Sequence, residues 1–219
     1  MKTHALLPGL ERFLEVCRVQ GLFAEEEPPA DACLEPGMLI AGQPCDPLLT
    51  AVHARVGYFR LAEGLLLLRL VDKHGFDLAS VNEEWRRDWS EPVRELLVFG
   101  KENVLAYYYA TVPGLSSSEG YQPVVRVSVY EEPYAVPLAS DVDRFFDTYS
   151  RYLEALVESP FYEEDGATAL TFPWDVPELI ARDQPLVEML RAGCFDFLME
   201  KSADAREWVE KVLAASVRR

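Results

Sequence analysis

The stretch that decides the fold is Pro123–Leu156, "PVVRVSVYEEPYAVPLASDVDRFFDTYSRYLEAL". It opens with valines that alternate with more polar residues, the period-two pattern of a strand with one buried face. A helix signature follows, because Ser140 precedes an apolar stripe and Asp143 stands three residues on, as in an acidic variant of the capping box. We therefore expect a strand followed by an amphipathic helix with Ser140 as N-cap. The stripe consists of Val142, Phe145, Phe146, Tyr149, Tyr152, Leu153 and Leu156.

Further strands are expected on the N-terminal side of this stretch. The runs 95–100 ("ELLVFG") and 103–114 ("NVLAYYYATVPG") are rich in β-forming residues, and three consecutive runs with short links predict an antiparallel meander. One or two strands are expected within 58–72 ("YFRLAEGLLLLRLVD") and a short one at 38–42. Residues 24–37 are predicted to be a loop because of their prolines and charges.

Helical patterns occur in the N-terminal half as well. Apolar residues recur at helical spacing in Leu6–Leu22 and in Cys45–Gly57, where Asp46 is a candidate N-cap. Trp85 and Trp89 lie four residues apart, so a helix there would place both rings on one face. Aromatic residues at this spacing predict core packing rather than a ligand cage.

The last sixty residues have a different pattern. Residues 160–175 resemble a loop with exposed aromatic side chains, and helical patterns follow to the C-terminus, with Ser202 as the expected cap of the last helix. This segment is short and polar for an independent domain. We expect an α/β domain at residues 1–159 and a helical extension at 160–219 packed on it.

Charge is the strongest compositional feature. The chain has 37 acidic and 21 basic residues, a formal net charge of −16, which disfavours nucleic acid and anionic membranes and favours basic partners. Two segments of the chain, between Val19 and Ala54 and between Tyr152 and Ala181, are acidic and contain no Lys or Arg. They hold Glu25, Glu26, Glu27, Asp31, Glu35 and Asp46 in the first, and Glu154, Glu158, Glu163, Glu164, Asp165, Asp175 and Glu178 in the second. Two interpretations remain open: solubilising loops, or a docking surface.

The cysteine and hydropathy patterns favour a cytoplasmic protein. The four cysteines (Cys17, Cys33, Cys45 and Cys194) form no CxxC pair and have no histidine at metal-ligand spacing, which predicts free thiols and no metal site. No apolar run approaches the roughly 20 residues of a membrane helix. Charged residues interrupt the N-terminal segment where a signal peptide would be apolar.

Catalytic motifs are missing from the sequence. It contains no GxGxxG, GK[ST] or GxSxG pattern, and the serines at 116–118 suit a turn between strands. His53 and His74 have no partner that the sequence identifies, and adjacent acids such as Glu163 and Glu164 are not placed across a cleft. We expect a protein that is not an enzyme and needs no cofactor.

One family resemblance follows from the order of these elements. A strand ending in Leu97–Gly100 precedes the aromatic run Tyr107–Tyr109, a strand containing Pro123–Val125, and a helix that begins at Ala139–Asp141 and continues through Phe145–Phe146. This order resembles the SUKH superfamily, the Smi/Knr-related proteins. More loosely, the resemblance begins at Asp46.

The resemblance implies an α/β (α+β) fold with a mixed, largely antiparallel sheet packed by helices. It also implies a bacterial immunity protein that binds and neutralises a toxin, often a nuclease, without catalysis. A basic toxin domain would suit the acidic surface, and the acids that we expect to bind it are Glu131, Glu132, Glu163, Glu164 and Asp165. The alternative is a cytoplasmic scaffold or regulatory protein-interaction module on the same fold.

Overall fold

The computed structural model describes residues 7–31, 34–35, 37–62, 64–72, 74–103, 106–130 and 132–217. Its strands are β1 (Phe23–Glu27), β2 (Leu39–Ile40), β3 (Gln43–Pro44), β4 (Tyr58–Leu61), β5 (Leu65–Leu67), β6 (Leu97–Glu102), β7 (Tyr107–Thr111), β8 (Val124–Ser128) and β9 (Tyr134–Ala139). Its α-helices are α1 (Pro8–Val19), α2 (Pro47–His53), α3 (Leu78–Asp88), α4 (Val142–Val157), α5 (Tyr162–Asp165), α6 (Pro177–Ile180), α7 (Gln184–Arg191), α8 (Asp196–Met199) and α9 (Ala203–Val217). Short 3-10 turns occur at Val93–Glu95, Pro113–Leu115 and Gly166–Ala169.

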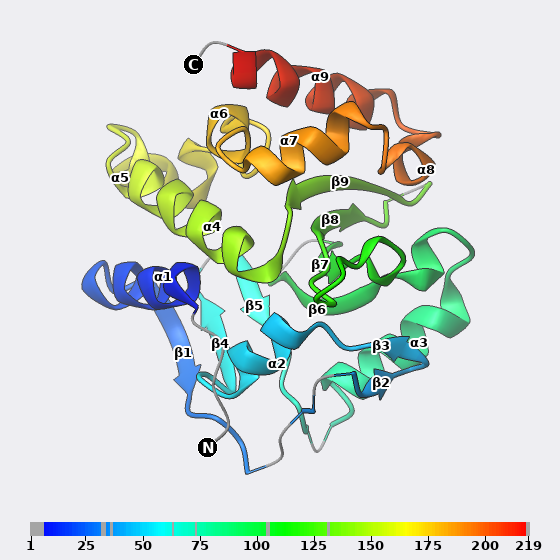
Figure 1. The fold of residues 1–219 in the computed structure, drawn as a ribbon. Coiled ribbons are helices and arrows are strands. Elements are labelled where there is room, and N and C mark those ends of the chain that lie inside the picture. Colours follow the sequence, from blue (N-terminus) through cyan, green and yellow to red (C-terminus); the bar gives the residue numbers. More distant parts are fainter. Residues whose placement is uncertain are drawn as a thin grey trace.

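The architecture is α+β, as expected from the sequence. In the described residues, seven strands form one sheet in the order β1-β4-β5-β6-β7-β8-β9, with α1 and α4 packed on it and α6–α9 beyond β9 (Figure 1). Neighbouring strands of this sheet pair antiparallel, and an isolated parallel bridge joins Arg69 to Asp77. The meander of β6, β7 and β8 is confirmed.

Strand β9 was not expected. It is the edge strand of the sheet and includes Pro137. Proline lacks the N–H that a central strand would donate, so its tolerated place is an edge. The prolines of "EEPYAVP" therefore argued against a strand in the sequence, although proline is tolerated in a strand at the edge of a sheet.

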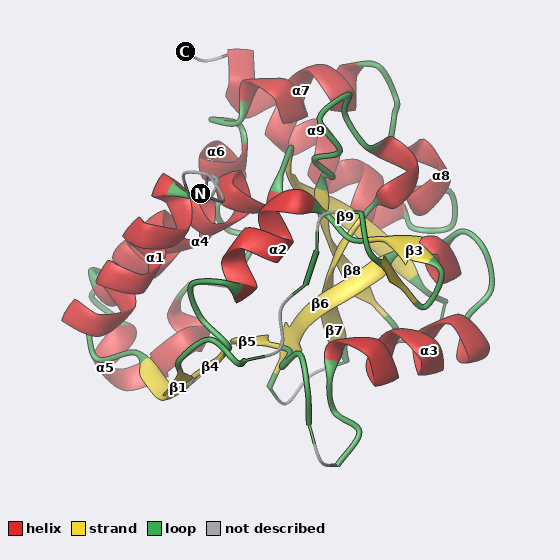
Figure 2. Ribbon diagram, turned by 60° about the horizontal axis from the view of Figure 1, so that its bottom comes forward, coloured by secondary structure: helices red, strands yellow, loops and turns green. Residues whose placement is uncertain are grey.

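Helices cover both faces of the meander. Tyr108 and Tyr109 are consecutive in β7, and side chains alternate between the faces of a strand. Tyr108 contacts Trp85 of α3 at a ring-centroid distance of 5.0 Å, whereas Tyr109 contacts Phe145 of α4 at 5.3 Å. Helices α3 and α4 therefore lie on opposite faces, and Figure 2 shows α3 well separated from α1 and α4.

The predicted apolar stripe of α4 is confirmed, because all seven of its residues are buried. The predicted helix start was wrong. Asp141, not Ser140, is the N-cap, and its carboxylate accepts from the Arg144 amide at 2.8 Å. Ser140 instead donates from its amide and its hydroxyl to Asp183, at 2.6 and 2.8 Å.

Asp143 also has a role that the sequence did not indicate. Its carboxylate accepts hydrogen bonds from the amides of Gly9 and Leu10, at 3.1 and 3.0 Å. These amides belong to the first turn of α1, where backbone N–H groups have no partner within the helix. Asp143 therefore caps a helix other than its own. The capping pattern could not reveal this, because both partners lie far away in sequence.

The loop predicted at residues 24–37 was wrong in part. Strand β1 occupies its start and pairs antiparallel with β4. Its three glutamates form ion pairs with arginines on neighbouring elements: Glu25 with Arg60 at 2.7 Å, Glu26 with Arg18 at 2.5 Å and Glu27 with Arg69 at 2.5 Å. Tertiary pairing overrides the low β-propensity of glutamate here.

The other predicted helices are confirmed in α1, α2 and α3. Asp46 caps α2 by accepting from the Leu48 and Leu49 amides at 2.6 and 3.0 Å. Asn82 of α3 is buried and exchanges two hydrogen bonds with the backbone of Val98 in β6, at 2.7 and 2.8 Å. This exchange fixes α3 on the sheet.

The C-terminal helices pack directly on the rest of the molecule. Helices α7, α8 and α9 contact β9, and α6 contacts α4. Ser202 caps α9, as expected, by accepting from the Ala205 amide at 3.1 Å. Helix α4 ends at Val157, close to the expected division at residue 159, and the division itself stays a prediction. None of the helices in the described residues is long and apolar enough to cross a membrane.

Candidate functional site

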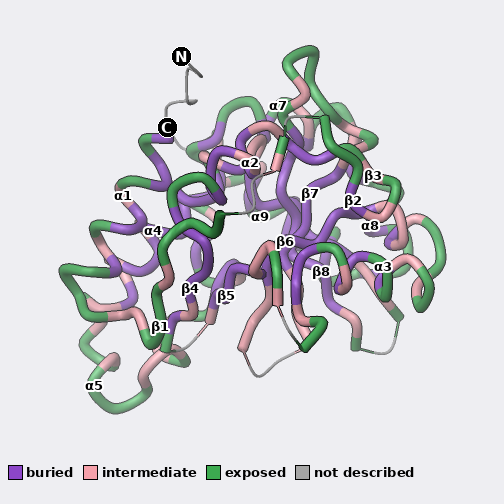
Figure 3. Tube along the Cα trace, turned by 90° about the horizontal axis from the view of Figure 1, so that it is seen from below, coloured by how far each residue is buried: buried purple, intermediate pink, exposed green. Residues whose placement is uncertain are grey.

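Three of the five predicted partner-binding acids lie together on α5. Glu163, Glu164 and Asp165 are all exposed and form no ion pair within the described part of the chain. Phe161 directly precedes them and is 59% exposed, an unusual position for a phenylalanine. We call Phe161–Asp165 the α5 segment. Figure 3 shows it at the exposed periphery.

The structure does not bring the other two predicted acids to this segment. Glu131 lies outside the described residues, and Glu132 is exposed between β8 and β9. Its neighbour Pro133 lines a small hollow with Phe197 near α8. Figures 1 and 2 both show α5 and α8 far apart.

The two acidic segments of the sequence differ in their pairing. In the first, the glutamates of β1 are held by arginines, so their charge is locally balanced. In the second, Glu154 pairs with Arg12 at 2.5 Å, while the α5 segment has no such partner. The α5 segment is therefore the place where three consecutive exposed acids have no ion pair within the described residues.

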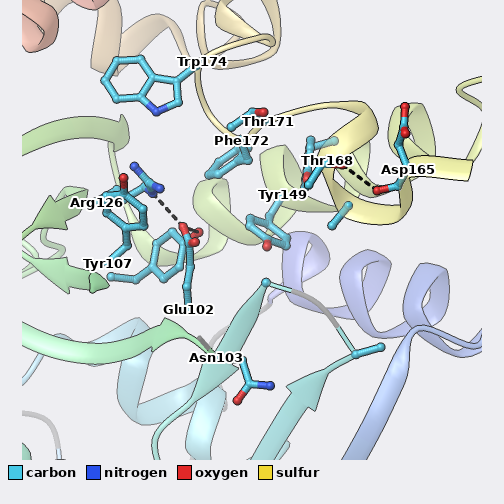
Figure 4. Close-up of a pocket in the computed structure, with 15 residues that line it drawn as sticks. Glu102, Asn103, Tyr107, Arg126, Tyr149, Asp165, Thr168, Thr171, Phe172 and Trp174 are labelled. Atoms are coloured by element: carbon cyan, nitrogen blue, oxygen red, sulfur yellow. Dashed lines mark hydrogen bonds and ion pairs between the residues drawn. The ribbon is translucent and has the colours of Figure 1, made fainter. Parts of the chain in front are cut away.

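A cleft that the sequence did not predict begins beside the α5 segment. It encloses about 560 Å³, which falls within the range of small-molecule sites. Its floor comes from β6, β7 and β8, and its opposite wall comes from residues 165–174 (Figure 4). Phe172 is buried and Trp174 is half-buried in this wall, so the expectation that these aromatic side chains are exposed was wrong.

A buried ion pair lies on the floor of this cleft. Arg126 Nε donates to Glu102 Oε1 at 2.8 Å, and the two side chains are 4% and 13% exposed. The Arg126 guanidinium also lies 3.5 Å from the centre of the Tyr107 ring, a cation–π geometry. Tyr109 donates to the same Glu102 oxygen at 3.4 Å.

The strand register explains how these groups meet. Arg126 of β8 pairs with Tyr109 of β7, and Tyr107 shares a face with Tyr109 because side chains alternate along a strand. The sequence placed Arg126 on the more polar face of its strand, but the residues that cover this face are distant in sequence. A single arginine among valines was the available signal.

Two tyrosines of the cleft, Tyr109 and Tyr149, are fully buried and stay protonated near neutral pH. Burial raises the pKa values of Tyr109 and Tyr149 well above their ordinary values. The Tyr152 hydroxyl donates to the Leu170 carbonyl at 2.9 Å and thereby ties residues 165–174 to α4. The cleft therefore has largely aromatic walls around one buried ion pair, with Asp165 at its α5 end.

Among the described residues, His53, Cys17 and Cys45 are further buried groups whose pKa values are shifted by burial. Burial alone lowers the pKa of His53 to about 4, and neither of its ring nitrogens has a hydrogen-bond partner among the described residues. Burial raises the pKa of the Cys17 thiol to about 12 and that of Cys45 to about 11, so neither is a reactive thiolate. The described part of the chain contains no His, Cys, Asp and Glu group that could hold a metal ion.

Two features therefore define the candidate site, the α5 segment and the cleft next to it. Asp165 belongs to both, since it ends α5 and lines the cleft. Comparison with protein-family models, with curated proteins and with solved structures finds no match for this chain.

Proposed function

We propose that this protein is a non-catalytic binding protein that docks a basic protein partner on the α5 segment. The observation that carries the proposal is the exposed Phe161 beside three carboxylates that no described arginine or lysine neutralises. The resemblance to the SUKH superfamily suggests the partner: a basic toxin domain, with the protein acting as its immunity protein in the cytoplasm.

The two kinds of side chain would contribute differently to such a complex. An aromatic residue that becomes buried removes apolar surface from water, at about 25 cal/mol per Å², and aromatic residues dominate the energy of many interfaces. The three carboxylates would mainly steer a basic partner to this surface and accelerate association. The net charge of −16 acts in the same direction at long range.

The experiment first looks for a toxin gene next to this one and uses its toxin domain as the probe; absence of such a gene would count against the immunity role. Co-expression should restore growth to cells that make the toxin domain, and the two proteins should co-purify as a complex. Absence of both effects would contradict the immunity role. A complex without rescue of growth would support the alternative of a general interaction module.

Matched variants then test the surface itself. E163Q/E164Q/D165N removes three charges from α5, whereas E83Q/E188Q/E210Q removes three exposed charges elsewhere that also have no ion pair within the described residues. The α5 variant should associate about tenfold more slowly at low salt, and the control should change little. Equal effects of the two variants would exclude α5 as the docking surface.

A further inference from the structure

The cleft contains hydrogen-bond donors that the described residues leave unused. Arg126 makes one hydrogen bond, from Nε to Glu102, and its two terminal nitrogens have no acceptor within the described part of the chain. The indole N–H of Trp174 also has no acceptor there. Figure 4 shows Trp174 across the cleft from Arg126, with the indole nitrogen on the side that faces it.

The free edge of Arg126 is open to the cleft. The Arg126 side chain is only 4% exposed, but its terminal nitrogens are not among the fully buried unpartnered atoms of the described residues, so they can donate to an acceptor that enters the cleft. The guanidinium cannot turn away freely, because Glu102 holds Nε and the Tyr107 ring lies against its face. Its free edge is therefore pre-oriented towards the space below Trp174.

Most of the remaining lining is apolar or aromatic, and Asn103, Asp165, Thr168 and Thr171 add polar groups to it. Tyr149 and Phe172 contact each other at a ring-centroid distance of 4.8 Å, and Ala62 and Gly64 line the cleft near them. A volume of about 560 Å³ leaves space for a body larger than a single ion. A fitting ligand has an acceptor group at one end and a flat apolar body.

We propose that the cleft binds an organic carboxylate with a flat apolar body. The carboxylate accepts hydrogen bonds from the terminal nitrogens of Arg126 and from the Trp174 indole, and the body lies against Phe172 and Tyr149. Glu102 acts as a positioning residue that orients Arg126. This proposal does not depend on the protein partner proposed above.

Charge decides between a carboxylate and other head groups. Arg126 supplies the single basic side chain of the described lining, and Glu102 and Asp165 already supply two carboxylates, so a dianionic phosphate would add more uncompensated negative charge than a monoanionic carboxylate. An organic cation would face Arg126 directly, and the two like charges would repel each other. A planar carboxylate matches the guanidinium edge in both charge and geometry.

Calorimetric titration of the full chain tests the head group. The probes are 3-phenylpropionate, its amide and 3-phenylpropylamine, which share one body and differ in charge. The carboxylate should bind with a Kd below about 1 mM and the amide at least about tenfold more weakly. Equal binding of acid and amide, tighter binding of the amine, or no binding of the acid up to about 10 mM would each overturn the proposal.

A second pair of probes separates two sources of the same chemistry. The tripeptide Ala-Ala-Phe with a free C-terminus and its C-terminal amide test whether the carboxylate belongs to a peptide chain end. Tighter binding of the free tripeptide than of 3-phenylpropionate would assign the cleft to a chain end, and the reverse order would assign it to a small molecule.

Variants locate the binding without removing the buried ion pair. Trp174→Phe keeps an aromatic ring and deletes the indole N–H, so it should weaken carboxylate binding several-fold. Trp89→Phe is the control, because Trp89 is half-buried beside Trp85 and does not line the cleft. Equal losses in the two variants, or no loss of carboxylate binding in Trp174→Phe, would overturn the proposal.

Discussion

Gly9 and Asp143 are in direct contact across the α1–α4 interface, although 134 positions separate them in the sequence. The Gly9 amide donates to the Asp143 carboxylate at 3.1 Å. A Cβ atom on Gly9 would lie 2.1 Å from the Asp143 carbonyl oxygen. The two helices therefore approach each other through a residue that has no side chain.

Gly9→Ala should destabilise the protein by about 1–3 kcal/mol, because the new methyl group meets backbone rather than a flexible side chain. Urea unfolding measures the change. Gly114→Ala is the control, since a Cβ there would contact nothing within 4 Å. Similar midpoints for the two variants would show that the interface adjusts without cost.

Asp143→Asn should reduce stability by about 1–2 kcal/mol. The amide keeps the shape of the side chain but weakens the charge-assisted hydrogen bonds to Gly9 and Leu10 at the start of α1. Asp31→Asn serves as the comparison, because Asp31 is exposed. A loss in Asp143→Asn no larger than in the comparison would mean that α1 does not depend on this cap.

His53 should make stability depend on pH. The pKa of His53 is lowered from 6.5 to about 4. Between these two pH values, His53 is therefore protonated in the unfolded chain and neutral in the folded protein. The contribution of neutral His53 to the free energy of unfolding is therefore fully present above about pH 6.5 and is lost as the pH falls towards 4. His53→Leu should remove about 2 kcal/mol of the stability difference between pH 7 and pH 5.

Asp46 makes the free energy of unfolding depend on pH in the opposite direction, so its effect must be considered together with that of His53. Burial raises its pKa from 3.8 to about 6, so the folded state binds the extra proton, and stability falls as the pH rises from about 4 to 6. The wild-type profile should be flat where the two effects cancel, and the His53→Leu profile should slope downward with rising pH. Parallel profiles for wild type and His53→Leu would contradict the assignment.

The ion pair of Glu102 and Arg126 should be more costly to break than to replace. Glu102→Leu or Arg126→Met alone leaves an uncompensated buried charge and should cost about 3–5 kcal/mol. The double variant should recover most of this loss. Additive losses measured by urea unfolding would show that the two side chains are not coupled.

The sequence predicted the parts of the fold that depend on local periodicity. The stripe of α4 and the cap at Asp46 were correct, because spacing along one element determines both. Asp143 and Arg126 were misjudged for the opposite reason: the groups that they contact, Gly9 and Glu102, come from other elements of the fold. Phe161 was correctly expected to be exposed, but its neighbours Glu163 and Glu164 looked no different from the glutamates of β1 until their pairing was known.

The two edges of the sheet have different protection against pairing with another chain. Strand β1 carries three charged glutamates on one edge, whereas β9 is mostly buried and depends on Pro137 and on contacts with α7, α8 and α9. An uncovered apolar edge strand is a template for self-association. The C-terminal helices thus keep the molecule from polymerising through its own sheet, and a shortened chain that ended after α4 would be expected to aggregate.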